Sequence, residues 1–236
     1  MSQNIDLQVH SKYGYTHNEK VAMAILTALT NFWQIPGCQY MWCQKRYPHF
    51  ALGLFTMVTS FMYHLLDSLD VEEFFIDQGS WHRLDNLGAI CCFVLLMIEF
   101  MHFKDRVKEE KLFLLGLFII IILQEGYPWN IEFTLIPIFI FLGILLQRYL
   151  NQFKKIVKDY HPQALKRGLI YLCLAIFCFA KGLDEFIDYL RFFHGMWHTF
   201  VTFAFFYVFQ IHKSKEEQID YFSQSLLGEH IKITVI

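Results

Sequence analysis

The feature that most constrains the fold is a series of long apolar stretches separated by short charged loops. A membrane-spanning helix needs about 20 mostly apolar residues, with a range of roughly 17–25. Seven stretches of about this length can be recognised, at roughly residues 19–36, 49–66, 84–103, 111–125, 131–149, 166–183 and 193–212. The sequence therefore predicts an all-α fold, a polytopic bundle of seven transmembrane helices.

The composition agrees with a membrane protein and gives no indication of a nucleic-acid-binding surface. Of the 236 residues, 55% are hydrophobic and 26 are phenylalanine, and the formal net charge is only −2. A soluble domain of this size would be less apolar, and a nucleic-acid-binding domain would be basic. We expect one seven-helix domain at residues 19–212, with a polar N-terminal tail at 1–18 and a polar C-terminal tail at 213–236.

The charged loops predict the orientation of the bundle. Acidic residues dominate the loops after the second and sixth stretches, whereas lysine and arginine gather in the alternate loops and in the C-terminal tail. Basic loops stay on the cytoplasmic side of a membrane. The N-terminus is therefore expected outside and the C-terminus inside, which requires an odd number of spans. We expect an integral, multi-pass protein of the endomembrane system or plasma membrane, or alternatively of the mitochondrial inner membrane.

Two histidines lie four residues apart in the last apolar stretch. His194 and His198 would share one face of a helix, about one turn apart, so their imidazoles could bind the same metal ion. Ionisable side chains are costly inside a bilayer and usually mark a site. The pair alone is a weak indication, because a single histidine in a helical bundle is more often a packing residue with a hydrogen-bond partner.

Other polar side chains are expected at the same depth in the membrane. In the predicted topology the second stretch ends on the outer side, where Ser60 and His64 lie one turn apart, and the third stretch begins there with Asp85. The histidine pair of the seventh stretch also begins on this side. Each residue has a simpler explanation when taken singly, such as packing, a local ion pair or a bond to its own helix. Together they predict a metal site.

The residue types indicate zinc chemistry. Three imidazoles with an open fourth position are typical of a catalytic zinc site, and the predicted ligands are His64, His194 and His198. Zinc lowers the pKa of a bound water molecule to about 7. Asp85 could orient this water or act as general base, and the Ser60 hydroxyl could hydrogen-bond the water or a substrate oxygen. An amide or ester carbonyl would be the group attacked.

These residues resemble the motifs of a known superfamily. The pattern S-x-x-x-H in the second stretch, an aspartate at the start of the third and H-x-x-x-H in the seventh resembles the CREST superfamily. That superfamily includes alkaline ceramidases, progestin and adiponectin receptors, and myomaker-like proteins. The similarity is closest to the myomaker-like branch, because Ser60–Asp67 is similar to its S-x-x-x-H-x-x-D, Asp85–Gly88 to its D-x-x-G, and Asp188 precedes the histidine pair.

The resemblance implies a zinc ion held by His64, His194 and His198, with Asp85 and Ser60 around the metal-bound water, and a role related to lipids. Three features of relatives are missing. Only Asn18 and Glu19 lie near the place of the acidic calcium-binding stretch that precedes the first span of ceramidases. The large extracellular domain of some myomaker-like relatives is absent, and the tail at 214–236 lacks the cysteines of myomaker. The sequence therefore does not predict ceramidase activity.

Two functions remain open. The first is an integral membrane zinc-dependent hydrolase that acts on an amide or ester bond of a lipid, with membrane lipid as its partner. The second is a non-enzymatic membrane protein, either fusogen-like or receptor-like, or an accessory structural subunit of a larger membrane complex, with an inherited or structural zinc site. A transporter is disfavoured, because the charged residues Glu99, Glu125 and Lys181 are few and lie near the ends of spans.

The cysteines and the other histidines do not indicate further sites. Four of the six cysteines lie inside apolar stretches, a distribution unlike the disulfide framework of a secreted domain. We expect all six to be free thiols that pack as small apolar side chains. The other histidines, among them His49 and His102, fall in tails, loops or span ends and are expected to be solvated.

Overall fold

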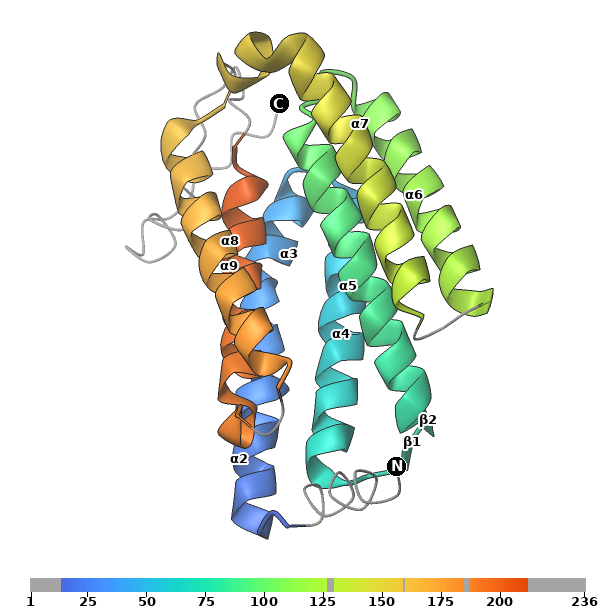
Figure 1. Ribbon diagram of the computed structural model, residues 1–236, viewed down its shortest axis with the longest axis vertical. Helices are drawn as coiled ribbons and strands as arrows, with labels where there is room; N and C mark the ends of the chain where they lie inside the picture. Colours follow the sequence, from blue (N-terminus) through green and yellow to red (C-terminus); the bar gives the residue numbers. More distant parts are fainter. Residues whose placement is uncertain (1–13, 127–129, 159, 185–186, 212–236) are drawn as a thin grey trace.

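A helix is present at each of the predicted apolar stretches, and the long helices lie side by side along the long axis of the computed structural model (Figure 1). The structure describes residues 14–126, 130–158, 160–184 and 187–211, so most of both predicted tails lies outside the described residues. The helices are α2 (His17–Thr27), the 3-10 helix η1 (Leu29–Gln34), α3 (Ile35–Cys43), α4 (Tyr47–Leu69), α5 (Gln78–Phe100), α6 (Arg106–Gly126), α7 (Ile131–Lys158), α8 (Pro162–Gly182), the 3-10 helix η2 (Tyr189–Arg191) and α9 (Phe192–Val208). The predicted helical fold is confirmed.

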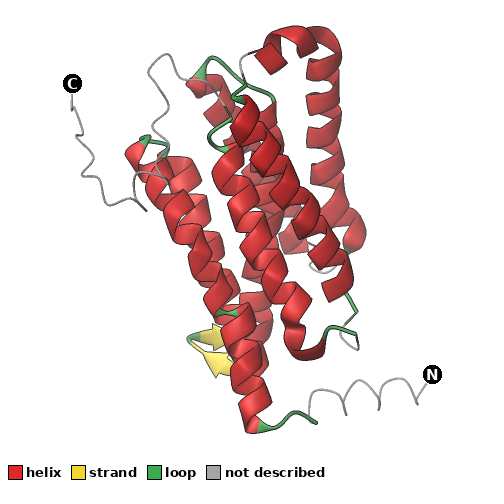
Figure 2. Cartoon of the chain, turned by 90° about the vertical axis from the view of Figure 1, so that its left-hand side faces the viewer, coloured by secondary structure: helices red, strands yellow, loops and turns green. Residues whose placement is uncertain are grey.

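A small antiparallel hairpin connects α4 to α5 at one end of the bundle (Figure 2). Its strands are β1 (Glu73–Phe74) and β2 (Ile76–Asp77), with Glu73 opposite Asp77. Asp77 also caps α5, because its Oδ1 atom accepts a hydrogen bond from the backbone N–H of Ser80 at 2.9 Å. Hydrogen bonds from Ser80 hold the pKa of the Asp77 carboxyl group below its ordinary value. The hairpin and the cap together fix where α5 begins.

Two helices extend beyond their predicted ends. The first predicted span, 19–36, is part of a continuous helical segment, His17–Cys43, in which α2, η1 and α3 follow one another. Pro36 does not end this segment, because it lies in the first turn of α3, where a helix loses no hydrogen bond by lacking an N–H group. The fifth predicted span continues to Lys158, and its backbone departs from helical geometry only at Gln152.

Four helical segments are long and apolar enough to cross a membrane, namely His17–Cys43, Tyr47–Leu69, Ile131–Lys154 and Pro162–Gly182. Many of their apolar side chains face outward, and Leu150 and Phe177 are examples. An outward apolar surface is costly in water and favourable in lipid. These helices indicate a membrane protein.

The helices form two groups that meet at α4 (Figure 1). Helices α8 and α9 pack tightly on each other, and α9 packs on α2 and η1. Helices α4, α5, α6 and α7 form the other group, which holds the main apolar core around Val94, Ile98, Ile120 and Phe141. Because α2 and α3 contact both α4 and α9, they join the two groups.

All six cysteines are free. Cys38, Cys91 and Cys178 pack in the interior as expected, whereas Cys43 and Cys173 are exposed, so the expectation that all six are packing residues is wrong for these two.

Candidate metal centre

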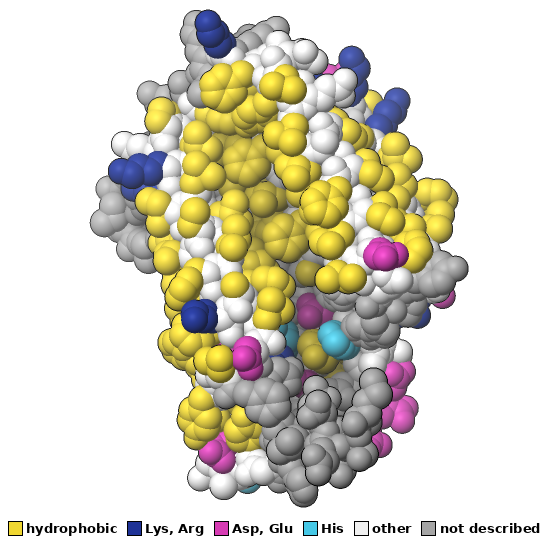
Figure 3. All heavy atoms as spheres, in the orientation of Figure 1, with side chains coloured by type: hydrophobic (Ala, Val, Ile, Leu, Met, Phe, Trp, Pro, Cys, Tyr) yellow, Lys and Arg dark blue, Asp and Glu magenta, His cyan; other side chains and the backbone are white. Residues whose placement is uncertain are grey.

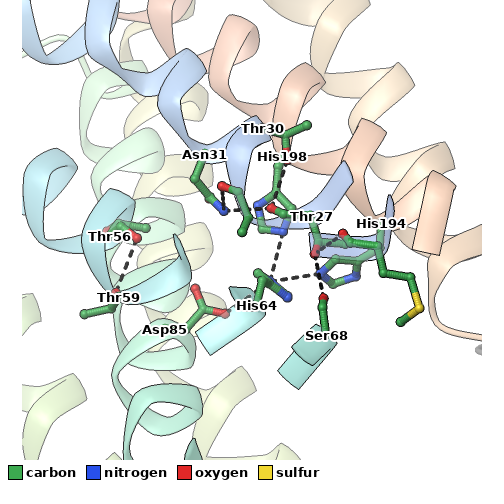
Figure 4. A network of polar contacts seen from close by, with 12 residues as sticks. Thr27, Thr30, Asn31, Thr56, Thr59, His64, Ser68, Asp85, His194 and His198 are labelled. Carbon is green, nitrogen blue, oxygen red and sulfur yellow. Dashed lines mark hydrogen bonds and ion pairs between the residues drawn. The ribbon is translucent and has the colours of Figure 1, made fainter. Parts of the chain in front are cut away.

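Three histidine side chains from two helices meet near one end of the bundle (Figure 4). His64 lies in the last two turns of α4, and His194 and His198 lie one turn apart on α9. The Nε2 atom of His64 is 3.2 Å from Nε2 of His194 and 3.1 Å from Nε2 of His198. His64 and His198 are buried, and His194 is half-buried. The structure therefore brings the three predicted ligands together.

The ring nitrogens of His194 and His198 lie at distances from His64 that suit the ligands of one zinc ion. Zinc binds imidazole nitrogen at about 2.0–2.1 Å with tetrahedral geometry, which puts two ligand nitrogens about 3.3 Å apart. The distances of 3.1 and 3.2 Å are close to this value. Hydrogen bonds alone would not satisfy the three imidazoles. Nε2 of His64 faces the Nε2 atoms of both His194 and His198, whereas a ring nitrogen carries at most one proton. The three histidines therefore fit a zinc ion.

Two side chains that carry oxygen lie beside the histidines. The Oδ2 atom of Asp85, near the start of α5, is 3.8 Å from Nε2 of His64. Ser60 lies one turn before His64 on α4 and is buried. Its hydroxyl lies near the Asp85 carboxyl group but makes no hydrogen bond of ordinary geometry within the described residues. All five residues predicted for the site are thus close to one another.

Asp188 fixes the first turn of α9 and, with it, the position of His194. The carboxylate is buried and accepts hydrogen bonds from the backbone N–H groups of Phe193 at 2.7 Å and of His194 at 2.9 Å. Leu190 and Arg191 have left-handed backbone conformations, with φ of 55° and 57°, at the turn between Asp188 and α9. A carboxylate at a helix N-terminus also interacts favourably with the helix dipole. Asp188 is a positioning residue for the site.

Gly195 allows α9 to lie against α2 at the level of the histidines. A Cβ atom at this position would be 2.1 Å from the backbone oxygen of Leu26 and 2.9 Å from its carbonyl carbon. No side chain fits in this space, because the atoms it would meet belong to the backbone of the neighbouring helix. Since Gly195 lies between His194 and His198, the contact holds both ligands beside α2.

Buried polar residues of α2, η1 and α4 surround the histidines and were not predicted (Figure 4). The Oγ1 atom of Thr27 is 3.4 Å from Oγ of Ser68, which links α2 to α4. Asn31 is fully buried, and its Nδ2 atom donates hydrogen bonds to two backbone carbonyls of its own helical segment, at 3.0 and 3.2 Å. The signal in the sequence was a pair of polar residues four positions apart, at 27 and 31, within an apolar stretch.

One face of the molecule is mostly apolar. Figure 3 shows one face of the molecule covered by hydrophobic side chains, with a recess in its lower half where histidine and acidic side-chain atoms are visible. Several of the exposed hydrophobic residues belong to the helices that form this face, among them Ile176 and Phe179 of α8. A ligand that reaches the recess along this face would pass over apolar side chains.

The prediction that His49 is solvated is wrong. Its side chain is buried at the other end of the bundle, next to Glu99 and Glu109. Arg46 forms ion pairs with both carboxylates. Arg46, His49, Glu99 and Glu109 lie at or near the ends of predicted spans, on the side of the basic loops. A comparison of polar residues expected at the same depth in the membrane, which predicted the three-histidine site, could therefore also have found this group.

The family comparison covers the whole site. The chain matches the family described as protein of unknown function (DUF3522) over residues 19–199, a range that contains Ser60, His64, Asp85, His194 and His198. None of the curated proteins compared with the chain matches it. Because the matched range covers well over half of the sequence, the chain belongs to the DUF3522 family.

Proposed function

We propose that the protein is an integral membrane hydrolase that uses a zinc ion to cleave an amide or ester bond in a lipid. The observation that carries this proposal is the meeting of three imidazole Nε2 atoms, from α4 and α9, with the Asp85 carboxylate 3.8 Å from one of them. Three nitrogen ligands with a carboxylate beside them are typical of catalytic zinc sites, which leave one coordination position open.

The proposed membrane arrangement has seven spans, with the N-terminus outside and the C-terminus inside. Each of the seven apolar stretches coincides with a helix, and the basic loops alternate with the acidic ones. The site then lies in the outer half of the bundle, where α4 ends and α5 and α9 begin. We propose the endomembrane system or plasma membrane as its location, with the mitochondrial inner membrane as the alternative.

Each site residue has a proposed role. A bound zinc ion would act as a Lewis acid and polarise the substrate carbonyl. His64, His194 and His198 would hold it. The Oδ2 atom of Asp85 would take a proton from the attacking water and later deliver it to the leaving amine or alcohol. The Ser60 hydroxyl, which lies near Asp85, would donate a hydrogen bond to a substrate oxygen.

A lipid substrate is supported by the surroundings of the site. The outward side chains of the four helices that could cross a membrane are mostly apolar, and Figure 3 shows hydrophobic side chains over the part of this face above the recess. Acyl chains could lie along this face while the polar bond enters the recess. The resemblance to the CREST superfamily, whose members include lipid amidases, points to the same class of substrate.

A non-enzymatic role is the second candidate, and one distance favours it. The Asp85 carboxylate is near enough to His64 that a small side-chain movement would make it a fourth ligand. A site closed by four protein ligands is typical of structural zinc. The protein would then be a fusogen-like or receptor-like membrane protein, or a structural subunit of a larger membrane complex, and the zinc would hold α4, α5 and α9 together.

A substrate screen tests the proposed function. Purified protein loaded with zinc is incubated with a panel of lipid amides and esters, and the released fatty acids are measured by mass spectrometry. We expect cleavage of at least one class, loss of activity after chelation, and recovery when zinc is restored. The exposed residue His17, at the start of α2, provides a control, because His17→Ala should keep full activity. Folded, zinc-loaded protein that cleaves nothing in the panel would favour the structural role.

A further inference from the structure

A pocket of about 320 Å³ lies between the beginning of α5 and the end of α6, at the end of the bundle that carries the hairpin (Figure 1). Its volume is in the range of small-ligand sites, roughly 300–1,000 Å³. The lining residues used below are Arg83, Leu84 and Leu87 of α5 and Ile121, Gln124 and Glu125 of α6. We call this cavity the α5–α6 pocket.

The α5–α6 pocket and the three-histidine site lie on different sides of α5. Successive residues of an α-helix are rotated by about 100°, so Ser80, Leu84 and Leu87 share one face and Asp85 is on the opposite one. The shared face lines the pocket, whereas Asp85 is directed toward His64 of α4, with 3.8 Å between Oδ2 and Nε2. A ligand in the pocket would therefore be separated from the zinc site by α5 itself.

A single ion pair forms the charged part of the pocket. Nη2 of Arg83 pairs with Oε2 of Glu125, which joins α5 to α6. Their side chains are 35% and 76% exposed, so both groups remain accessible from outside. A guanidinium has five N–H donors and a carboxylate has about four acceptor positions, and one contact leaves most of these available to a ligand. The pocket thus offers one positive and one negative group side by side.

The apolar part of the pocket lies on the side of this ion pair that faces the middle of the bundle. Leu87 comes one turn after Arg83 on α5, and Ile121 comes one turn before Glu125 on α6. Because α5 begins and α6 ends at this end of the bundle, both apolar residues are closer to its middle than the charges are. A lipid whose headgroup lies at a membrane surface changes from charged to apolar in the same direction.

A row of apolar side chains continues from the pocket along α6. Ile121, Phe118 and Leu114 are spaced by three and four residues, so they share one face of the helix. All three are half-exposed or more. The row from Glu125 to Leu114 is about 16 Å long, at 1.5 Å per residue. It provides an apolar surface along which an acyl chain would lie.

Hydrogen bonds behind the pocket fix the position of its wall. Gln124 is buried, and its Oε1 atom accepts a hydrogen bond from Nδ2 of Asn86 at 3.1 Å. Its Nε2 atom donates to Oγ1 of Thr134 at 3.4 Å. These contacts join α5, α6 and α7, so the pocket is formed before a ligand arrives, as is usual for ligand sites.

The charges of the pocket select a zwitterionic headgroup with a primary ammonium group. A phosphate without a cation would meet the Glu125 carboxylate, and a cation without an anion would meet Arg83. A headgroup with both charges satisfies both residues through charge-assisted hydrogen bonds. Quaternary ammonium groups are typically bound by aromatic rings, and the described lining of the pocket contains none.

We propose that the α5–α6 pocket binds one phosphatidylethanolamine molecule, with its phosphate at Arg83, its ammonium group at Glu125 and an acyl chain along Leu87, Ile121 and the apolar row of α6. The proposal uses the membrane arrangement described above, in which this end of the bundle is at the outer surface. It does not depend on the zinc ion or on the hydrolase activity, because the pocket is on the other side of α5.

The test is the lipid bound to the full-length protein in detergent, counted by native mass spectrometry. The protein is incubated with an equimolar mixture of dioleoyl phosphatidylethanolamine, phosphatidylcholine and phosphatidylglycerol. We expect about one phosphatidylethanolamine per chain in the wild type, in roughly tenfold excess over each of the other lipids. Ile121→Trp should lose this lipid, because the larger ring fills the pocket. Ile122→Trp is the matched control and should keep it, since Ile122 is also exposed but does not line the pocket.

Glu125→Gln tests the headgroup without changing the apolar part of the pocket. Its side chain is exposed, so the variant should fold. It should bind phosphatidylglycerol as well as phosphatidylethanolamine, because the partner of the ammonium group is lost and Arg83 still binds phosphate. Zinc content, measured on the same preparations, should be equal in all variants. Wild type without bound lipid or without preference for phosphatidylethanolamine, or an Ile121→Trp variant that binds as much of it as the wild type, would overturn the proposal.

Discussion

The variant Gly195→Ala is expected to be destabilised by about 3 kcal/mol or more and to lose most of its bound zinc. The added Cβ atom would lie 2.1 Å from the backbone oxygen of Leu26, so α9 and α2 must move apart. His194 and His198 flank this position and would move with α9 relative to His64. Zinc tolerates changes of only about 0.2 Å in ligand distance. Thermal unfolding should show a Tm lower by about 6–12 °C, and mass spectrometry should show the loss of metal.

Gly143→Ala is the matched control for this variant. Gly143 also lies inside a long helix, α7, but an added Cβ atom there would meet nothing within 4 Å. Alanine favours helix formation over glycine by about 1 kcal/mol, so the control should be as stable as the wild type or slightly more stable. If Gly195→Ala kept the wild-type Tm and zinc content, α2 and α9 would not make the close contact described above.

The variant Asp85→Asn is expected to keep its zinc but to lose lipid hydrolysis by a factor of about 10²–10⁴. Asparagine has nearly the same shape as aspartate but cannot take a proton from water at neutral pH. The three imidazole ligands are unchanged, so metal binding should remain. Zinc content and the rate of fatty acid release, measured on the same preparation, separate the two effects.

The same variant distinguishes a catalytic site from a structural one. If Asp85 were the fourth ligand of a structural zinc ion, Asp85→Asn would bind zinc more weakly and unfold at a lower temperature. Asp77→Asn is a suitable control, because Asp77 is on the exposed cap of the same helix and asparagine caps helices about as well as aspartate. If Asp85→Asn lost both zinc and thermal stability while Asp77→Asn lost neither, the hydrolase proposal would be contradicted.

The helical fold could be predicted because long apolar stretches leave few alternatives. Inside a bilayer the backbone must satisfy its own hydrogen bonds, and a single segment can do this only as a helix. Helix ends were predicted less well, since the predicted span 19–36 continues to Cys43 through a proline in the first turn of α3. The number of spans and the orientation remain predictions, because helix positions alone do not show which helices cross a membrane.

The candidate site could be predicted because its residues follow simple spacing rules. His194 and His198 are one helical turn apart, and His64 and Asp85 come to the same level once neighbouring spans run in opposite directions. Two parts of the site could not be predicted. The contact of Gly195 with Leu26 requires that the first and last helices be neighbours, and the cap formed by Asp188 requires two left-handed residues after it.

The buried group formed by Arg46, His49, Glu99 and Glu109 was missed for a different reason. Its residues are distributed over three helices without a local motif, so His49 and Glu99 each had the sequence context of an ordinary residue at a span end. Their contacts follow only from the packing of α4, α5 and α6. A buried group of this kind is visible in the sequence only when charged residues are compared at equal depth across all predicted spans.

The most direct test of the central claim is the zinc content of the purified wild type and of His194→Ala, measured by mass spectrometry. We expect about one zinc ion per chain in the wild type and close to none in His194→Ala, with His17→Ala equal to the wild type. This result would establish that the three histidines of α4 and α9 hold the metal. A wild type without zinc, or a His194→Ala variant with as much zinc as the wild type, would contradict it.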